Sequence, residues 1–151
     1  MNTLSYTIVP PGEYGFTTFQ LLVDGTPMQE FAGYVECVLP YWEIKGDFSV
    51  AEPDPTSEDD CLRIVGTCDC GESGCGATHA RVTKDATTVR IADFSGWRRP
   101  GANQEVVVGR ENYDRVMREL TGFAEQERQI VAARVQAAEA LRRQGNQRNV
   151  P

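Results

Sequence analysis

The sequence predicts an α+β domain, in which a mainly antiparallel sheet of five or six strands packs against one short helix and one long C-terminal helix. Short runs that alternate apolar and polar residues recur between turn-forming residues as far as residue 108, a pattern typical of strands. Beyond residue 109 the apolar residues follow helical spacing instead, and residues 125–143 are rich in the helix formers Ala, Arg, Gln and Glu.

In the N-terminal part, residues 3–9 and 15–23 are rich in β-branched and aromatic residues and predict a pair of strands. Residues 28–39 predict the short helix, because their apolar side chains recur at the i, i+3, i+4, i+7 spacing of one helix face. That face consists of Met28, Phe31, Ala32, Val35 and Val38. Residues 40–50 are apolar around a Gly-Asp pair and fit either a short hairpin or an irregular segment over the core.

In the C-terminal part, residues 78–83 and 87–94 alternate and predict a hairpin that turns at residues 84–86. Residues 105–108 are a short apolar run that predicts a buried strand. The long helix is expected to begin after Gly109, which is an acceptable N-cap residue.

Gly122 is expected either to kink the long helix or to end its first segment. We therefore divide the chain into an acidic α+β domain (1–122), an extension of the helix (123–144) and a disordered tail (145–151). The extension has a thin, alanine-rich apolar stripe, formed by Ile130, Val131, Val135, Ala138 and Leu141. This stripe favours either a helix that packs back across the domain or one that projects and forms a homo-oligomer through residues 123–143.

The segment 66–76 holds three of the five cysteines and four glycines, and glycine permits a tight reversal between two strands. Three sulfurs and an imidazole suit tetrahedral zinc, so one interpretation is a structural zinc site. Its ligands would be Cys68, Cys70, Cys75 and His79. The other interpretation is a set of reduced thiols, or a disulfide, in a glycine-built turn, since C-x-C is a less usual ligand spacing than C-x-x-C. An extended chain would place Cys61 about 23 Å from Cys68, which excludes it as a ligand.

Two surface segments are candidates for binding a partner. Residues 51–60 carry five acids and two prolines, which predict either a solvated loop or an acidic patch that docks on a basic protein. The loop after residue 94 combines a tryptophan with two arginines. Either it binds an anion or a ring, or the tryptophan caps the core while the arginines pair with carboxylates. The candidate partner-binding residues are Asp54, Glu58, Asp59, Asp60, Trp97, Arg98 and Arg99.

Charge limits the classes of partner. The chain has a net charge of −7, and residues 1–109 hold seven bases against sixteen acids, a net charge of −9. Such a body repels a phosphate backbone, so a basic protein is an expected partner and nucleic acid is not. No apolar run approaches the roughly 18 residues of a membrane span. The N-terminus shows no signal-like segment and five cysteines is an odd number, so we expect a cytoplasmic protein.

The sequence contains no G-x-G-x-x-G, P-loop, G-x-S-x-G or H-E-x-x-H motif. Ser-His-Asp or histidine-based metal catalysis would have to use its single histidine, His79, which lies beside the cysteine segment and not in an obvious nucleophile setting. We therefore expect a non-catalytic binding protein whose acidic surface meets a basic protein, as in immunity or inhibitor proteins, adaptors and phage anti-defence proteins. Two alternatives stay open. One is a thiol or zinc-knuckle protein with a structural-metal or redox role, and the other is a structural protein that self-assembles through its C-terminal helix.

The run T-C-D-C-G-E-S-G-C at residues 67–75, followed by A-R-V at 80–82 and D-F at 93–94, resembles small uncharacterised proteins of GC-rich bacteria. The resemblance covers about residues 62–120 and implies no activity. In those proteins an apolar residue often stands where this chain has His79. The resemblance therefore argues against a Cys-Cys-Cys-His site and leaves open a three-thiol site completed by another residue.

Overall fold

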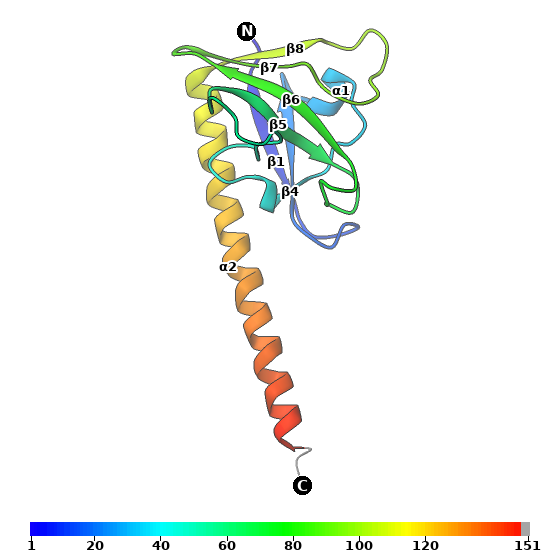
Figure 1. The fold of residues 1–151 in the computed structure, drawn as a ribbon, viewed down its shortest axis with the longest axis vertical. Helices are drawn as coiled ribbons and strands as arrows, with labels where there is room; N and C mark the ends of the chain where they lie inside the picture. Colours follow the sequence, from blue (N-terminus) through cyan, green and yellow to red (C-terminus); the bar gives the residue numbers. More distant parts are fainter. Residues whose placement is uncertain (149–151) are drawn as a thin grey trace.

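The computed structural model describes residues 1–148 as two four-stranded antiparallel sheets, a short helix α1 and a long helix α2 (Figure 1). The α+β class is therefore confirmed. The strands divide into two sheets instead of forming one, because residues 44–51 leave regular structure and run along the outer edge of β5 (Asp60–Thr67). There the amide of Ile64 donates to the carbonyl of Ser49 at 2.8 Å, and the amide of Ala51 donates to that of Leu62 at 2.8 Å. These bonds occupy the edge that another strand would have used.

The first sheet is centred on β2 (Thr18–Val23), which pairs with β1 (Leu4–Val9), β3 (Thr26–Pro27) and β4 (Leu39–Pro40). The strand pair predicted over residues 3–9 and 15–23 is thus confirmed. A 3-10 turn at Tyr41–Glu43 follows β4 and leads into the irregular segment, which was one of the two interpretations of residues 40–50.

Helix α1 spans only Met28–Ala32, so the prediction of a helix as far as residue 39 is wrong. Gly33 ends α1 with a φ of 71°, a left-handed conformation that glycine adopts without steric cost. A Cβ at Gly33 would also lie only 2.5 Å from the Cβ of Ala102. Beyond it the chain is extended, and Val38 pairs with Thr67 in an isolated bridge.

The second sheet has the order β5-β6-β7-β8, with β6 at Ala77–Lys84, β7 at Thr88–Ala92 and β8 at Glu105–Gly109. All its pairs are antiparallel, so the predicted hairpin and the predicted buried strand are both confirmed. The turn between β6 and β7 is held by the carboxylate of Asp85, which accepts the backbone amides of Thr87 and Thr88 at 2.8 and 2.7 Å.

Helix α2 runs without interruption over Arg110–Arg148, so Gly122 neither kinks nor ends it. Its first half packs against the domain through five buried residues, Tyr113, Val116, Met117, Leu120 and Ala124. Its second half projects well beyond the sheets (Figure 1), so the helix does not pack back across the domain. Residues 145–148 are helical rather than part of a disordered tail, and residues 149–151 lie outside the described residues.

The core lies where the two sheets and the first half of α2 meet. Both sheets contribute fully buried side chains to it, as does α2, among them Leu4, Val23, Val82, Ile91 and Leu120. Burial of this apolar surface is the main stabilising contribution to the fold. Within residues 1–148, no helix has both the length and the apolarity needed to cross a bilayer.

Candidate functional site

Residues 68–76, which we call the cysteine knuckle, join the end of β5 to the start of β6. The knuckle is closed by its own backbone. The amide of Cys68 donates to the carbonyl of Gly76 at 2.9 Å, and that of Gly71 donates to Cys68 at 2.9 Å. Gly71 has a φ of 80°, and a Cβ there would lie 2.8 Å from the rings of Phe16 and Trp42. The bend is therefore a defined turn packed against the domain.

The knuckle brings three thiols together. The sulfur atoms of Cys68, Cys70 and Cys75 all lie within 4.8 Å of one another, and Cys68 Sγ is 2.9 Å from Cys70 Sγ. All three cysteines are free; Cys68 is half-buried, and the other two are exposed. Tetrahedral zinc with Zn–S bonds of about 2.3 Å holds its sulfurs roughly 3.8 Å apart. Three of the four predicted ligands therefore converge. Small shifts of their side chains would bring the sulfurs to the spacing of a tetrahedral site.

The structure does not bring His79 into this cluster. Strand β6 begins at Ala77, so residue 79 already belongs to the sheet, where it pairs with Ile64. Its backbone amide donates to Ser95 Oγ at 2.8 Å. Cys61 is buried near the far end of β5, as the extended spacing predicted, and Cys37 also lies outside the thiol cluster.

A carboxylate that the sequence did not single out lies beside the knuckle. A Cβ built on Gly76 would be 3.7 Å from Glu36 Oε1 and 3.7 Å from Cys68 Cβ, so this carboxylate packs over the base of the turn. It is placed there by the bridge between Val38 and Thr67, whose amides and carbonyls exchange hydrogen bonds of 3.1 and 2.6 Å. No local pattern links residue 36 to residues 68–76; only the topology joins them.

The thiols influence one another's ionisation. Hydrogen bonds from the side chain and the backbone amide of Cys70 lower the pKa of Cys68. Hydrogen bonds with the sulfurs of Cys68 and Cys70 raise the pKa of Cys75 to about 11. Cys68 is therefore more readily ionised than Cys75. The nearby carboxylate of Glu36 opposes negative charge on Cys68.

The acidic candidates lie on an exposed loop before β5 and within its first residue. Asp54, Glu58 and Asp59 are exposed and form no ion pair within residues 1–148. Asp60 differs, because it pairs with Arg81 at 2.9 Å. Three of the four acidic candidates are therefore free to meet a cation from outside.

Trp97 does not cap the core, and no carboxylate among residues 1–148 pairs with the arginines beside it. The indole is 67% exposed, and Phe94 is buried in its place, stacked on Tyr34 at 5.4 Å between ring centroids. Arg98 donates to the carbonyl of Ala32 at 2.9 and 2.7 Å, and Arg99 donates to that of Glu30 at 2.9 Å. These bonds to backbone carbonyls near α1 hold the loop while leaving Trp97 at the surface.

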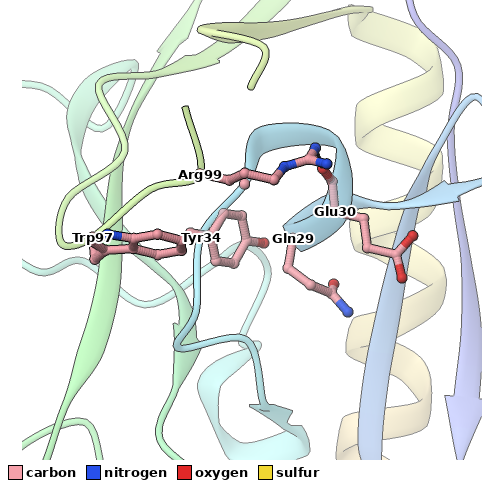
Figure 2. A pocket seen from close by; sticks show the side chains of 6 residues that line it. Gln29, Glu30, Tyr34, Trp97 and Arg99 are labelled. Atoms are coloured by element: carbon pink, nitrogen blue, oxygen red, sulfur yellow. Dashed lines mark hydrogen bonds between the residues drawn. The ribbon is translucent and has the colours of Figure 1, made fainter. Parts of the chain in front are cut away.

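A hollow of about 340 Å³ lies between α1 and this loop (Figure 2). Its lining residues are Gln29, Glu30, Gly33, Tyr34, Trp97 and Arg99. They offer aromatic surface, an amide and one charge of each sign, but no thiol, imidazole or serine hydroxyl. Such a lining can bind a side chain or a ring.

No protein-family model, no curated protein and no solved structure matches this chain. Its function is therefore inferred from its own residues.

Proposed function

We propose that the protein is a non-catalytic binding protein whose cysteine knuckle holds one soft divalent cation of the zinc type. The observation that supports this proposal is the convergence of three sulfur atoms within 4.8 Å on a turn closed by its own hydrogen bonds. Thiolates are preferred by zinc, Cu(I) and iron–sulfur centres, and zinc adds no redox chemistry. The cation would fasten the end of β5 to the start of β6.

A metal accounts for all three thiols, whereas a disulfide does not. A bond between Cys68 and Cys70 would close a small, strained ring and leave Cys75 without a role. Asp69 and Glu72 on the knuckle and Glu36 beside it make the surroundings negative, which attracts a divalent cation. The fourth ligand of a tetrahedral site would be Glu36 or a water molecule.

Metal analysis tests the proposal directly. Protein purified without added zinc is expected to contain close to one equivalent by elemental analysis and native mass spectrometry. Cobalt substituted for zinc should show intense thiolate-to-metal absorption. Cys70→Ser should lose the metal, while Cys37→Ala, which removes a thiol outside the cluster, should keep it. A metal-free protein that reversibly loses two hydrogen masses on oxidation would instead establish the redox alternative.

The same cobalt protein identifies the fourth ligand. If Glu36 is the ligand, Glu36→Gln keeps the thiolate bands, since the three sulfurs remain, but weakens binding and shifts the ligand-field bands. If water completes the site, Glu36→Gln leaves both unchanged.

The second candidate function is binding of a basic protein, and Trp97 favours it. An indole that is 67% exposed on a loop fixed by backbone hydrogen bonds resembles the aromatic anchors of protein interfaces. The free carboxylates of Asp54, Glu58 and Asp59 would add salt-dependent attraction. Partners captured by the purified chain should be basic and should dissociate as the salt concentration rises from about 50 to 300 mM. Trp97→Ala should abolish their binding. Val35→Ala, which truncates another exposed side chain, should leave it unchanged. Acidic partners, or binding that ignores salt, would contradict this candidate.

A further inference from the structure

We propose that the projecting part of α2, residues 129–148, pairs in antiparallel orientation with the same segment of a second copy of the chain. This inference goes beyond the metal and partner proposals and does not depend on them. It rests on the missing cover of this segment, on the continuation of its packing face and on the order of charges along it.

The projecting segment has no domain beneath it. The last side chain of α2 that reaches the domain is Arg128, which donates to the carbonyl of Ile44 at 2.7 Å and to that of Trp42 at 3.4 Å. Every residue from 129 to 148 is exposed. At a rise of about 1.5 Å per residue, these twenty residues correspond to a length of roughly 30 Å. Figure 1 shows this part of α2 projecting beyond the sheets. Most of the stability of a helix in a protein comes from packing of its apolar face, and the domain gives this segment no such packing.

The face of α2 that packs on the domain continues into the projecting segment. Met117 and Ala124 are buried against the domain, and Val131 and Ala138 follow at the same seven-residue interval on the exposed part. Exposed apolar side chains flank this line, with Ile130 44%, Val135 51% and Leu141 69% exposed. A hollow of about 480 Å³ runs along it, lined by Val131, Arg134, Val135, Ala138, Glu139 and Arg142. The small alanines allow a second helix to approach closely.

The order of charges favours a second copy as the occupant. The base of the segment presents Glu127, because the guanidinium of neighbouring Arg128 is bonded to the domain. Residues 129–148 carry four arginines and one glutamate, with Arg142, Arg143 and Arg148 towards the tip. Parallel pairing would set these arginines against one another. Antiparallel pairing instead places the tip of one copy, with its arginines, near Glu127 at the base of the second copy. The two helix dipoles then point in opposite directions, which is favourable. The contact is then a two-fold symmetric one, so each charge pair occurs twice.

The mass of the full chain in solution tests the pairing. Light scattering coupled to chromatography, and sedimentation over a range of concentrations, are expected to show twice the monomer mass of 16.7 kDa. The double variant Val131→Glu/Val135→Glu should be a monomer whose domain melts at an unchanged temperature. Gln136→Glu, which adds a charge on another side of the same helix, should remain a dimer. A full chain that stays at 16.7 kDa at every concentration would overturn the proposal.

Charge reversal tests the orientation. When residues 129–148 pair with the same residues in antiparallel orientation, Arg148 at the tip of one copy lies beside Glu127 at the base of the other. Glu127→Arg and Arg148→Glu should each weaken the dimer roughly three- to tenfold, because each introduces two like-charge contacts at solvent-accessible positions. The double variant Glu127→Arg/Arg148→Glu should restore the affinity of the original chain. A parallel dimer would gain nothing from combining the two changes, since residue 127 would then face residue 127 of the partner copy. Failure of the double variant to recover would therefore overturn the antiparallel arrangement.

Discussion

The backbone carbonyl of Glu36 occupies the place where a side chain at residue 66 would lie. A Cβ added to Gly66 would be 2.3 Å from that carbonyl oxygen and 2.8 Å from Cys37 Cα. Glycine at this position lets the segment after α1 close onto β5, and this close approach puts the Glu36 carboxylate beside Cys68. The geometry of the candidate metal site thus depends on a residue that carries no functional group.

Gly66→Ala is expected to destabilise the protein by about 2–3 kcal/mol, because backbone atoms must move to admit one methyl group. Denaturant unfolding measures this loss. Gly74→Ala is the matched control, since a Cβ there meets nothing within 4 Å and the backbone conformation suits any residue. Gly66→Ala should also bind metal more weakly than the original chain, because the segment carrying Glu36 is displaced. Equal stability of the two alanine variants would contradict the packing argument.

Asp47 is the centre of a nearly buried charge network. Its carboxylate pairs with Lys84, lies 3.8 Å from the guanidinium of Arg63 and accepts the hydroxyl of Tyr113. Arg63 also donates to the carbonyl of Phe48 at 2.7 Å. These contacts connect the irregular segment, the second sheet and α2. The network has a structural role, since each cation in it already has an anionic or carbonyl partner.

Asp47→Asn is expected to cost about 2–4 kcal/mol of unfolding free energy, because it leaves two cations without their counter-charge. The side chains involved are only 5–15% exposed, so solvent compensates little. Asp60→Asn breaks the exposed pair with Arg81 and should cost at most about 1 kcal/mol. If urea unfolding gives the two variants similar stability, the buried network is not what holds these elements together.

Local patterns predicted the strands well, because a strand with one buried face shows its alternation directly in the sequence. The hairpin of β6 and β7 is an example, and the clustering of Cys68, Cys70 and Cys75 followed from their nearness in the chain. Helix α1 shows the limit. The apolar spacing of residues 28–38 continues past Gly33, but the close contact with Ala102 and the left-handed turn end the helix there. Such a contact between distant segments leaves no local signal.

Two contacts, one at the candidate site and one in the nearly buried charge network, were missed for the same reason. Glu36 lies beside the knuckle, and Asp47 meets both Lys84 and Tyr113, only because the topology joins segments far apart in sequence. One of the two interpretations of the loop after residue 94 placed Trp97 as a cap on the core, yet Phe94 is buried against Tyr34 instead. Which of two neighbouring aromatic residues is buried depends on the register of the loop, and composition does not determine it.

The carboxyl of Asp85 is expected to titrate at low pH. Hydrogen bonds from the backbone amides of Thr87 and Thr88 and from the Thr88 hydroxyl lower its pKa from 3.8 to about 2. Because the folded pKa lies below the unfolded one, the stability that this carboxylate contributes is fully present above about pH 4 and is lost as the pH falls towards 2. Carboxyl NMR shifts should give the midpoint directly.

The stability difference between the wild-type chain and Asp85→Ala should accordingly shrink between about pH 4 and pH 2. Ala86→Ser changes the same turn without removing the carboxylate, so its difference from wild type should not depend on pH. A midpoint near the ordinary value for Asp, or a constant difference for Asp85→Ala, would show that the turn does not hold the carboxylate as described.

Gly122→Ala is expected to stabilise the protein by about 0.5–1 kcal/mol, because glycine costs about this much in the interior of a helix. A Cβ at residue 122 meets nothing within 4 Å, and its backbone is helical, so the methyl group is admitted without strain. A helix that kinked or ended at residue 122 would be destabilised by the same change. Far-UV circular dichroism and thermal unfolding distinguish the two outcomes.

Gly109→Ala serves as the control. A Cβ at residue 109 is equally free of contacts, but this residue lies at the junction of β8 and α2, outside the helix interior, so the gain in stability should be smaller. Loss of stability in Gly122→Ala would mean that α2 is not one continuous helix, and the antiparallel pairing proposed for its second half would lose its rigid connection to the domain.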